Sequence, residues 1–253
     1  MLMHPTLEKL RTLQLRGMLA ALEDQQRTPE IEQLTFEERL GLLLDREDTQ
    51  RANRRLATRL KAAKLRQNAS LEDIDYHAKR HLDRALILEL GGCSWIARTH
   101  NLLITGPTGV GKTYIACALA HKACREGYKV LYQRLPRLLH ELEIAKGDGR
   151  YRPLLTSLQR FDLLLLEDWG VAPLTDGNRR DLLELFDDRF NTKSTLITSQ
   201  LPSDAWHDYL ADPTLADAIL DRFIHNAHKL RIPGDSRRKT HSPLTRATTT
   251  SEA

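Results

Sequence analysis

The feature that most constrains this chain is a glycine-rich segment at residues 106–113, which reads GPTGVGKT. It follows a short apolar run and precedes a stretch of helical pattern that begins YIACALA. Glycines let a backbone curl so that its N–H groups face an anion, and the first turn of a helix supplies further unpaired N–H groups. A strand, such a loop and a helix in this order predict a phosphate-binding unit.

This segment fits the P-loop pattern G-x-x-x-x-G-K-[S/T]. In that pattern the lysine, here Lys112, reaches the β and γ phosphates, and the hydroxyl of Thr113 is offered to Mg²⁺. A plain glycine turn before a helix is the simpler alternative. The predicted nucleotide-binding residues are Gly106, Pro107, Thr108, Gly109, Val110, Gly111, Lys112 and Thr113.

From residue 101 onward, short apolar runs alternate with stretches of helical periodicity. The runs predict strands at residues 102–105, 130–132, 163–166, 195–198 and 230–232. Strands separated by helices form a parallel sheet with helices on both faces. The predicted fold class is therefore α/β, with a five-stranded parallel sheet in a P-loop domain at residues 71–240.

The N-terminal region has a different pattern. The first hundred residues are expected to be helical, because leucines recur at helical spacing between Leu7 and Leu22 and no strand-like alternation appears. Thr35 and Glu38 have the spacing of a capping box, so a second helix is expected to start there, and it can run past Leu60. We therefore expect a small all-helical domain at residues 1–70. Residues 241–253 have almost no large apolar side chains and are expected to be disordered.

A second acidic motif complements the P-loop. Residues 161–170 read FDLLLLEDWG, in which four leucines predict a strand covered on both faces. Glu167 and Asp168 stand at its carboxyl end, where a P-loop enzyme needs carboxylates to hold the metal and orient the attacking water. The usual order places aspartate first. Glu167 brings an extra methylene to the metal position, which bears on Mg²⁺ geometry and on turnover.

Five motifs in this order make the resemblance specific. They are the P-loop, the ED-W-G strand end, STLITSQLP, DAILDRFIHNAHKLRI and GDSRRK. Together they resemble the IstB family of AAA+ ATPases over residues 1–240. Members of that family assist the transposase of a class of bacterial insertion sequences and are related to the DnaC helicase loaders. The resemblance implies an AAA+ fold for the P-loop domain.

The resemblance also implies roles for three residues outside the two phosphate-site motifs. Ser199 falls at the first sensor, near the γ phosphate. Arg222 falls at the arginine finger, which would enter the site of a neighbouring copy and make hydrolysis depend on assembly. Arg238 aligns with the second sensor, although Arg237 beside it leaves the alignment uncertain by one residue. The alternatives are a surface ion pair of Arg222 with Asp217 or Asp221, and an unstructured basic tail around Arg238.

The net charge of +4 conceals one basic block. Residues 51–66 carry seven basic and no acidic side chains. On a helix, six of them fall on one face, opposite Ala52, Leu56, Leu60 and Ala63. Such a face suits a phosphate backbone and predicts salt-sensitive DNA binding with little sequence selectivity. A solvated helix face is the alternative. The six are Arg51, Arg54, Arg55, Arg59, Lys61 and Arg66.

A second basic segment lies between the second and third strands. The resemblance implies that extra helical material here lines the DNA channel of an assembled ring or spiral. Acidic residues at 141, 143 and 148 dilute its charge, and only Tyr151 is nearby for stacking on bases, which favours contact with duplex DNA. The candidate phosphate contacts are Arg134, Arg137, Lys146, Arg150 and Arg152.

The leading hypothesis is an ATP-dependent assembly switch. Its cofactors are ATP and Mg²⁺, and its partners are duplex DNA, further copies of the chain and, from the resemblance, a transposase. The absence of a long apolar run or a signal-like N-terminus leads us to expect a cytoplasmic protein without a membrane partner. Three alternatives remain, namely a replicative helicase loader, a P-loop kinase for a small metabolite, and a DNA architectural protein with a degenerate nucleotide site.

Overall fold

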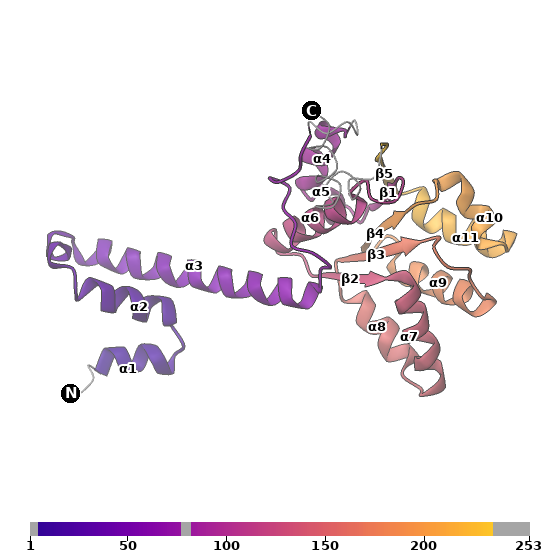
Figure 1. Cartoon of the computed structure of the whole chain (residues 1–253). Coiled ribbons are helices and arrows are strands. Elements are labelled where there is room, and N and C mark those ends of the chain that lie inside the picture. The colour runs from indigo at the N-terminus through magenta and orange to yellow at the C-terminus, as the bar shows by residue number, and fades with distance from the viewer. Residues whose placement is uncertain (1–4, 77–81, 235–253) are drawn as a thin grey trace, which may run out of the picture. The chain divides into compact units, whose positions relative to one another are not determined.

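The computed structural model describes residues 5–76 and 82–234, which form two compact units (Figure 1). We call residues 5–58 the first unit and residues 59–234 the second unit, because the division falls between Thr58 and Arg59. The sequence places this boundary after residue 70. It falls earlier because Arg59 donates to the carbonyl of Cys124 at 2.8 Å and Arg66 pairs with Glu167, which ties residues 59–70 to the second unit.

The first unit is all helical. The leucine pattern between Leu7 and Leu22 is divided at Gln14, whose φ of 58° breaks the helix. Glu47 is buried and accepts hydrogen bonds from the backbone N–H groups of Gly17 at 2.6 Å and Met18 at 3.2 Å, so it caps the N-terminus of the second helix. The elements are α1 (Pro5–Thr12), α2 (Arg16–Gln25), the 3₁₀ helix η1 (Pro29–Gln33) and α3 (Phe36–Ala63).

The capping box at the start of α3 is present. The backbone N–H of Thr35 donates to the Glu38 carboxylate at 2.8 Å, and the N–H of Glu38 donates to the Thr35 hydroxyl at 3.3 Å. The helix continues past Leu60 but ends at Ala63. Helical structure was expected through the first hundred residues, and this was wrong for residues 64–76, which contain no helix. Lys64 has a φ of 51°, and the polar residues that follow hydrogen-bond locally in place of a helix.

The second unit is built on a five-stranded parallel sheet with the order β2-β3-β4-β1-β5. This confirms the predicted α/β fold class. The last strand begins earlier than the predicted residues 230–232, because most of its residues are polar and the apolar run marks only its end. The strands are β1 (Asn101–Thr105), β2 (Val130–Arg134), β3 (Leu163–Trp169), β4 (Ser194–Ser199) and β5 (Ala227–Arg231).

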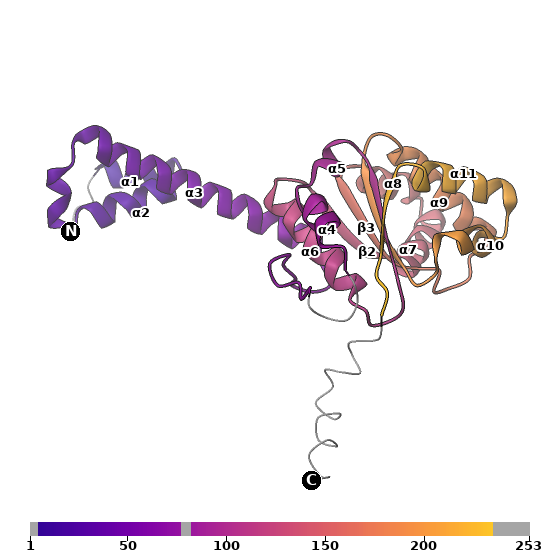
Figure 2. The same cartoon turned by 90° about the horizontal axis from the view of Figure 1, so that it is seen from above.

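Helices cover both faces of this sheet (Figure 2). On one face, α7, α8, α9, α10 and α11 pack into a single apolar core with alternate residues of the central strands, such as Leu164, Leu166 and Ile197. The alanine-rich helix α6 packs across the strands from the other face. The helices are α4 (Arg84–Gly91), α5 (Ser94–Ala97), α6 (Lys112–Arg125), α7 (Leu135–Gly147), α8 (Tyr151–Gln159), α9 (Asp176–Arg189), η2 (Ser203–Ala205), α10 (Trp206–Leu210) and α11 (Pro213–Ile224).

Two buried side chains fix the ends of the central strands. Trp169, at the carboxyl end of β3, stacks on Trp206 with ring centroids 4.6 Å apart, which anchors the turn that carries the acidic pair. At the opposite end, Arg189 is 1% exposed and donates to the carbonyls of Leu158, Phe161 and Ser194. Among the described residues, no helix is both long and apolar enough to cross a bilayer.

Candidate nucleotide-binding site

The glycine-rich segment joins β1 to α6 at the carboxyl edge of the sheet. Gly106 has a φ of 154°, and a side chain there would overlap the carbonyl of Ile232, which follows β5. Gly111 has a φ of 102° and forms the N-cap of α6. The glycines are therefore required by close approach and by left-handed backbone conformation. The loop brings the unpaired N–H groups of the α6 N-terminus to a phosphate-sized space, as the sequence predicts.

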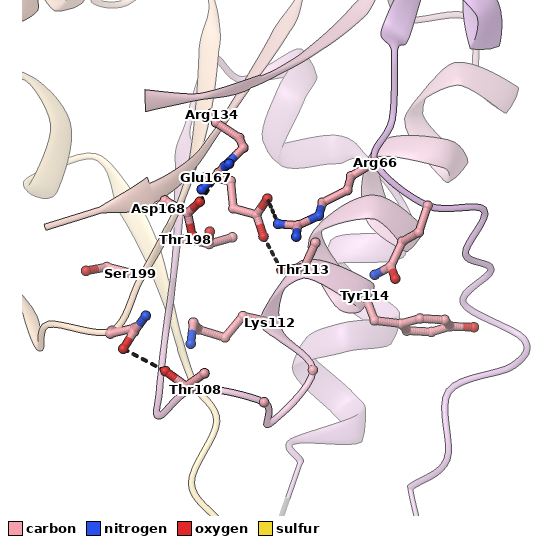
Figure 3. Close-up of a pocket in the computed structure, with 14 residues that line it drawn as sticks. Arg66, Thr108, Lys112, Thr113, Tyr114, Arg134, Glu167, Asp168, Thr198 and Ser199 are labelled. Atoms are coloured by element: carbon pink, nitrogen blue, oxygen red, sulfur yellow. Dashed lines mark hydrogen bonds and ion pairs between the residues drawn. The ribbon is translucent and has the colours of Figure 1, made fainter. Parts of the chain in front are cut away.

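Lys112 lies over this loop. Its Nζ donates to the carbonyls of Gly106 at 2.7 Å and Pro107 at 2.8 Å, which holds the ammonium at the loop mouth. The cavity in front of it has a volume of about 510 Å³. Its lining residues come from the P-loop, β2, β3, β4 and the segment after α3 (Figure 3).

Glu167 is the most heavily bonded group in the cavity. It is 3% exposed, and its Oε1 accepts the hydroxyl of Thr113. Its Oε2 accepts the hydroxyl of Tyr132 and the Nη1 of Arg66, the latter at 2.9 Å. Burial alone would raise the pKa of Glu167, but these three donors hold the pKa below its usual value, so the carboxylate is charged at neutral pH. Burial and Glu167 together raise the pKa of Tyr132, which keeps this phenol protonated.

Asp168 has a different environment from its neighbour. Its φ is 68°, and the register of β3 against β4 shifts between Leu166 and Trp169. This irregularity turns the carboxylate toward the end of β2, where it accepts the Nε of Arg134 at 2.7 Å. Arg134 is thus placed in the nucleotide cavity. Its predicted contact with DNA remains a prediction, and its observed partner is the second carboxylate of the acidic pair.

Ser199 is not free to contact a phosphate in this structure. Its hydroxyl donates to the carbonyl of Trp169 at 3.0 Å and accepts the N–H of Leu201 at 3.0 Å, and the residue is 1% exposed. The next residue, Gln200, reaches the P-loop instead, where its Oε1 accepts the hydroxyl of Thr108 at 2.7 Å. Gln200 is therefore the polar side chain next to the end of β4 that contacts the loop.

The residues present fit a magnesium-bound nucleoside triphosphate. The loop offers backbone N–H groups and Lys112 to the phosphates, and the hydroxyl of Thr113 lies against the Glu167 carboxylate, which is the hard oxygen donor set that Mg²⁺ prefers. A cavity of this volume lies within the range of small-molecule sites. Residues 66, 67 and 114 also line the cavity.

Comparison with known proteins agrees with this geometry. The family described as IstB-like ATP binding protein matches residues 8–245. A protein of Sinorhizobium fredii named as an insertion sequence ATP-binding protein is 53% identical over 94% of this chain and 98% of its own length. A protein of the same description from Pseudomonas fluorescens is 52% identical over 80% of this chain and 88% of its own length.

The chain belongs to the IstB-like ATP-binding protein family. It is an ATP-binding protein of the AAA+ type, and the predicted resemblance is confirmed. A crystal structure of DnaI superposes with a TM-score of 0.56 at 21% identity, covering 65% of this chain and 91% of that one. Replication initiator DnaA superposes with a TM-score of 0.55 at 19% identity, covering 70% and 54%. These two likenesses show the shared fold.

The arginine expected to act between subunits points away from its own nucleotide cavity. Arg222, on α11, pairs with Asp187 of α9 and donates to the carbonyl of Ala218 at 2.9 Å. Its partner is thus neither Asp217 nor Asp221. Arg238, expected at the second sensor, lies outside the described residues, as does the tail at 241–253.

The cations predicted to contact DNA divide into two groups. Most of them pair with carboxylates: Arg51 with Glu47, Arg66 with Glu167, Arg134 with Asp168, Lys146 with Asp181, Arg150 with Asp148, and Arg152 with Glu184. A further candidate, Arg137, pairs with Glu141. Arg59 donates to the last turn of α6. The structure gives no ion-pair partner within residues 5–76 and 82–234 to Arg54, Arg55 and Lys61, all exposed on α3.

Sequence reasoning missed three side chains of the site, because each is distant in sequence from both motifs. Arg66 was placed on the basic face of a helix, which was wrong because α3 ends at Ala63 and the chain then turns into the cavity. Tyr132 looked like an ordinary strand residue, although the end of β2 next to an acidic strand end was a usable signal. Gln200 was passed over in favour of Ser199, and β-strand alternation could have distinguished the two.

Proposed function

We propose that this ATP-binding protein is an ATP-dependent assembly switch on DNA. ATP with Mg²⁺ binds in the cavity between the P-loop and the acidic strand end, and copies of the chain associate around it. The assembly binds duplex DNA with little sequence selectivity and recruits a transposase, and hydrolysis releases it. The observation that carries the proposal is a complete phosphate and carboxylate site in a member of a family whose relatives are named for insertion sequences.

Within the site, each group has a separate task. Lys112 and the loop N–H groups bind the phosphates, and the Thr113 hydroxyl and Glu167 would hold Mg²⁺, which would supply positive charge to the phosphates. Asp168 accepts a hydrogen bond from the attacking water and orients it. Arg134 holds the Asp168 carboxylate at 2.7 Å and so sets where that water is bound.

The position of Arg222 supports a role between copies. The side chain is held by Asp187 on the surface formed by α9 and α11, and it does not line its own cavity. An arginine that completes a phosphoryl-transfer site can be supplied by a neighbouring molecule and is then required for turnover. We assign Arg222 to the site of an adjacent copy.

Contact with DNA is assigned to Arg54, Arg55 and Lys61, the predicted contact residues on α3 that have no ion-pair partner among the described residues. Arg54, Arg55 and Lys61 carry no acidic neighbour between them along the helix, so their charge is available to phosphates. The paired cations of α7 and α8 would first have to exchange a carboxylate for a phosphate. They remain secondary candidates.

Assembly is tested by electron microscopy and light scattering of the chain with Mg²⁺, random duplex DNA and either a nonhydrolysable ATP analogue or no nucleotide. The expected result is larger particles on DNA with the analogue. Lys112→Ala should abolish this change because it removes nucleotide binding. Arg222→Ala should bind nucleotide normally but lose DNA-stimulated hydrolysis, whereas Arg160→Ala, which removes an exposed cation directly after α8, should behave as the parent chain does.

The partner is tested by pull-down with two baits, an insertion-sequence transposase and a replicative helicase. ATP-dependent capture of the transposase supports the proposal. Capture of the helicase alone would replace transposase recruitment with helicase loading, while an analogue that changed neither particle size nor DNA binding would remove the assembly switch itself.

A further inference from the structure

The segment after α3 places a positive charge inside the nucleotide cavity. Arg66 follows the turn at Lys64, whose φ is 51°, and its Nη1 lies 2.9 Å from Oε2 of Glu167. The arginine side chain is 46% exposed and its partner's 4%, so the pair stands at the cavity wall with the guanidinium on the open side. Figure 3 shows Arg66 reaching Glu167 from the side opposite β4.

Glu167 has two kinds of partner. Thr113 and Tyr132 are neutral donors that position the carboxylate without changing its charge. Arg66 is the one cation within the described residues that pairs with it. A divalent ion bound against Thr113 would draw on the same negative charge, because Oε1 and Oε2 belong to one delocalised carboxylate. Arg66 and a metal ion at Thr113 are therefore competitors for Glu167.

We propose that Arg66 sets the magnesium affinity of the nucleotide site by competing with Mg²⁺ for Glu167. Metal binding weakens the Arg66 to Glu167 ion pair, and the ion pair in turn weakens metal binding. Arg66 is a positioning residue that acts through Glu167. The inference rests on the proposed binding of ATP and Mg²⁺ in this cavity, and it adds a residue from outside the P-loop and the acidic strand end.

Removal of Arg66 should leave the segment folded, because other contacts hold it. Ala69 is 4% exposed and packs with Cys117 and Ala118 of α6, and Leu65 and Leu71 pack against the same cluster. Further along, Glu72 pairs with Arg125 at 3.0 Å. The Arg66 side chain is thus one of several contacts that hold this segment. Its substitution should remove the positive charge beside Glu167 while the segment stays folded.

The test is the Mg²⁺ dependence of binding of a fluorescent nonhydrolysable ATP analogue, measured with Arg66→Ala, Arg66→Lys and the control Arg160→Ala. We expect Arg66→Ala to lower the Mg²⁺ concentration at half-maximal binding by about tenfold, which is the lower end of the range for loss of a hydrogen bond to a charged group. Affinity in excess EDTA should stay within about twofold, since the phosphates are held by the loop. Arg66→Lys keeps the charge and should restore most of the parent midpoint.

Two results would overturn the role of Arg66. An unchanged Mg²⁺ midpoint in Arg66→Ala would show that the arginine and the metal do not compete. Weaker binding at every Mg²⁺ concentration would show that Arg66 instead contacts the nucleotide. Circular dichroism of each variant identifies misfolding, in which case Arg66→Gln replaces the alanine variant. Failure of the parent chain itself to bind the analogue would overturn the proposed function, and is distinguishable from both.

Discussion

The charged groups of the nucleotide cavity and the cations of α3 are held in opposite ways. In the cavity, Arg66 pairs with Glu167 and Arg134 pairs with Asp168, so each charge has a fixed position and a fixed partner. On α3, three exposed cations have no ion-pair partner among the described residues and act through their electrostatic field. A paired charge is costly to remove because its partner is left behind, whereas an unpaired surface charge matters only to an anionic ligand. The α3 cations are Arg54, Arg55 and Lys61.

The largest expected effect comes from the most deeply held cation, Arg189. Burial lowers the pKa of its guanidinium to about 10, yet it is charged at neutral pH and satisfies three carbonyls and the hydroxyl of Thr195. Arg189→Met should lower the free energy of unfolding by about 4 kcal/mol, because these acceptors are left buried and unpaired. Urea denaturation measures it, with Arg54→Met expected to change the value by less than about 0.5 kcal/mol. If Arg189→Met lowered the free energy of unfolding by less than about 1 kcal/mol, the contrast between buried, paired cations and exposed, unpaired ones would be wrong.

The unpaired cations should show the reverse behaviour. Combined replacement of Arg54, Arg55 and Lys61 by alanine should weaken duplex DNA binding about a hundredfold at low salt and flatten the slope of log affinity against log salt by about 2.7. Stability and nucleotide affinity should be unchanged. Fluorescence anisotropy over a salt series is the measurement.

The matched control for that experiment removes three paired cations, Lys146, Arg150 and Arg152. This control should change the salt slope less and the stability more, because Asp181 is 2% exposed and loses its counter-charge. Equal slopes for the two triple variants would show that pairing in the free chain does not decide which cations contact DNA.

An intermediate effect is expected at Glu167, where the sequence departs from the usual aspartate. Glu167→Asp draws the carboxylate back by about 1.5 Å, the length of one C–C bond, from Thr113, Tyr132 and Arg66. The shorter side chain would lengthen all three hydrogen bonds that position the carboxylate. The variant should therefore lower ATP turnover about tenfold. Steady-state hydrolysis checks this, and Asp73→Asn is the control. Faster turnover would show that glutamate at position 167 slows hydrolysis relative to aspartate.

The smallest effect is expected at a partly exposed ion pair. Asp162 accepts the N–H of Lys129 at 2.9 Å and pairs with Lys193 at 2.6 Å. Burial raises its pKa, but these contacts outweigh burial and hold the pKa below 3.8. Its stabilisation is therefore present above about pH 4 and is lost as the pH falls through the lowered pKa. Asp162→Asn should cost less than about 1 kcal/mol at pH 7. The difference from the parent, measured by urea midpoints across pH, should vanish in acid; a constant difference would assign the effect to packing.

Local patterns were enough to predict the fold of the second unit. Apolar runs such as residues 163–166 and the glycine loop at 106–113 depend on backbone geometry within a few residues, and the structure places them as expected. The capping box of Thr35 and Glu38 is local in the same sense. The predictions failed where a local signal was interrupted, as at Gln14 and Lys64, because one left-handed residue ends a helix without altering the apolar periodicity around it.

The sequence by itself determined a parallel α/β fold with a P-loop and two carboxylates at the end of a central strand, since these features are encoded in short contiguous segments. Only the tertiary structure decided the partners of those carboxylates. Arg66 and Tyr132 reach Glu167 from positions 101 and 35 residues away along the chain. The fold also decided which basic residues of the segment 51–66 form ion pairs and which do not. Pairing depends on which carboxylates the fold brings within reach.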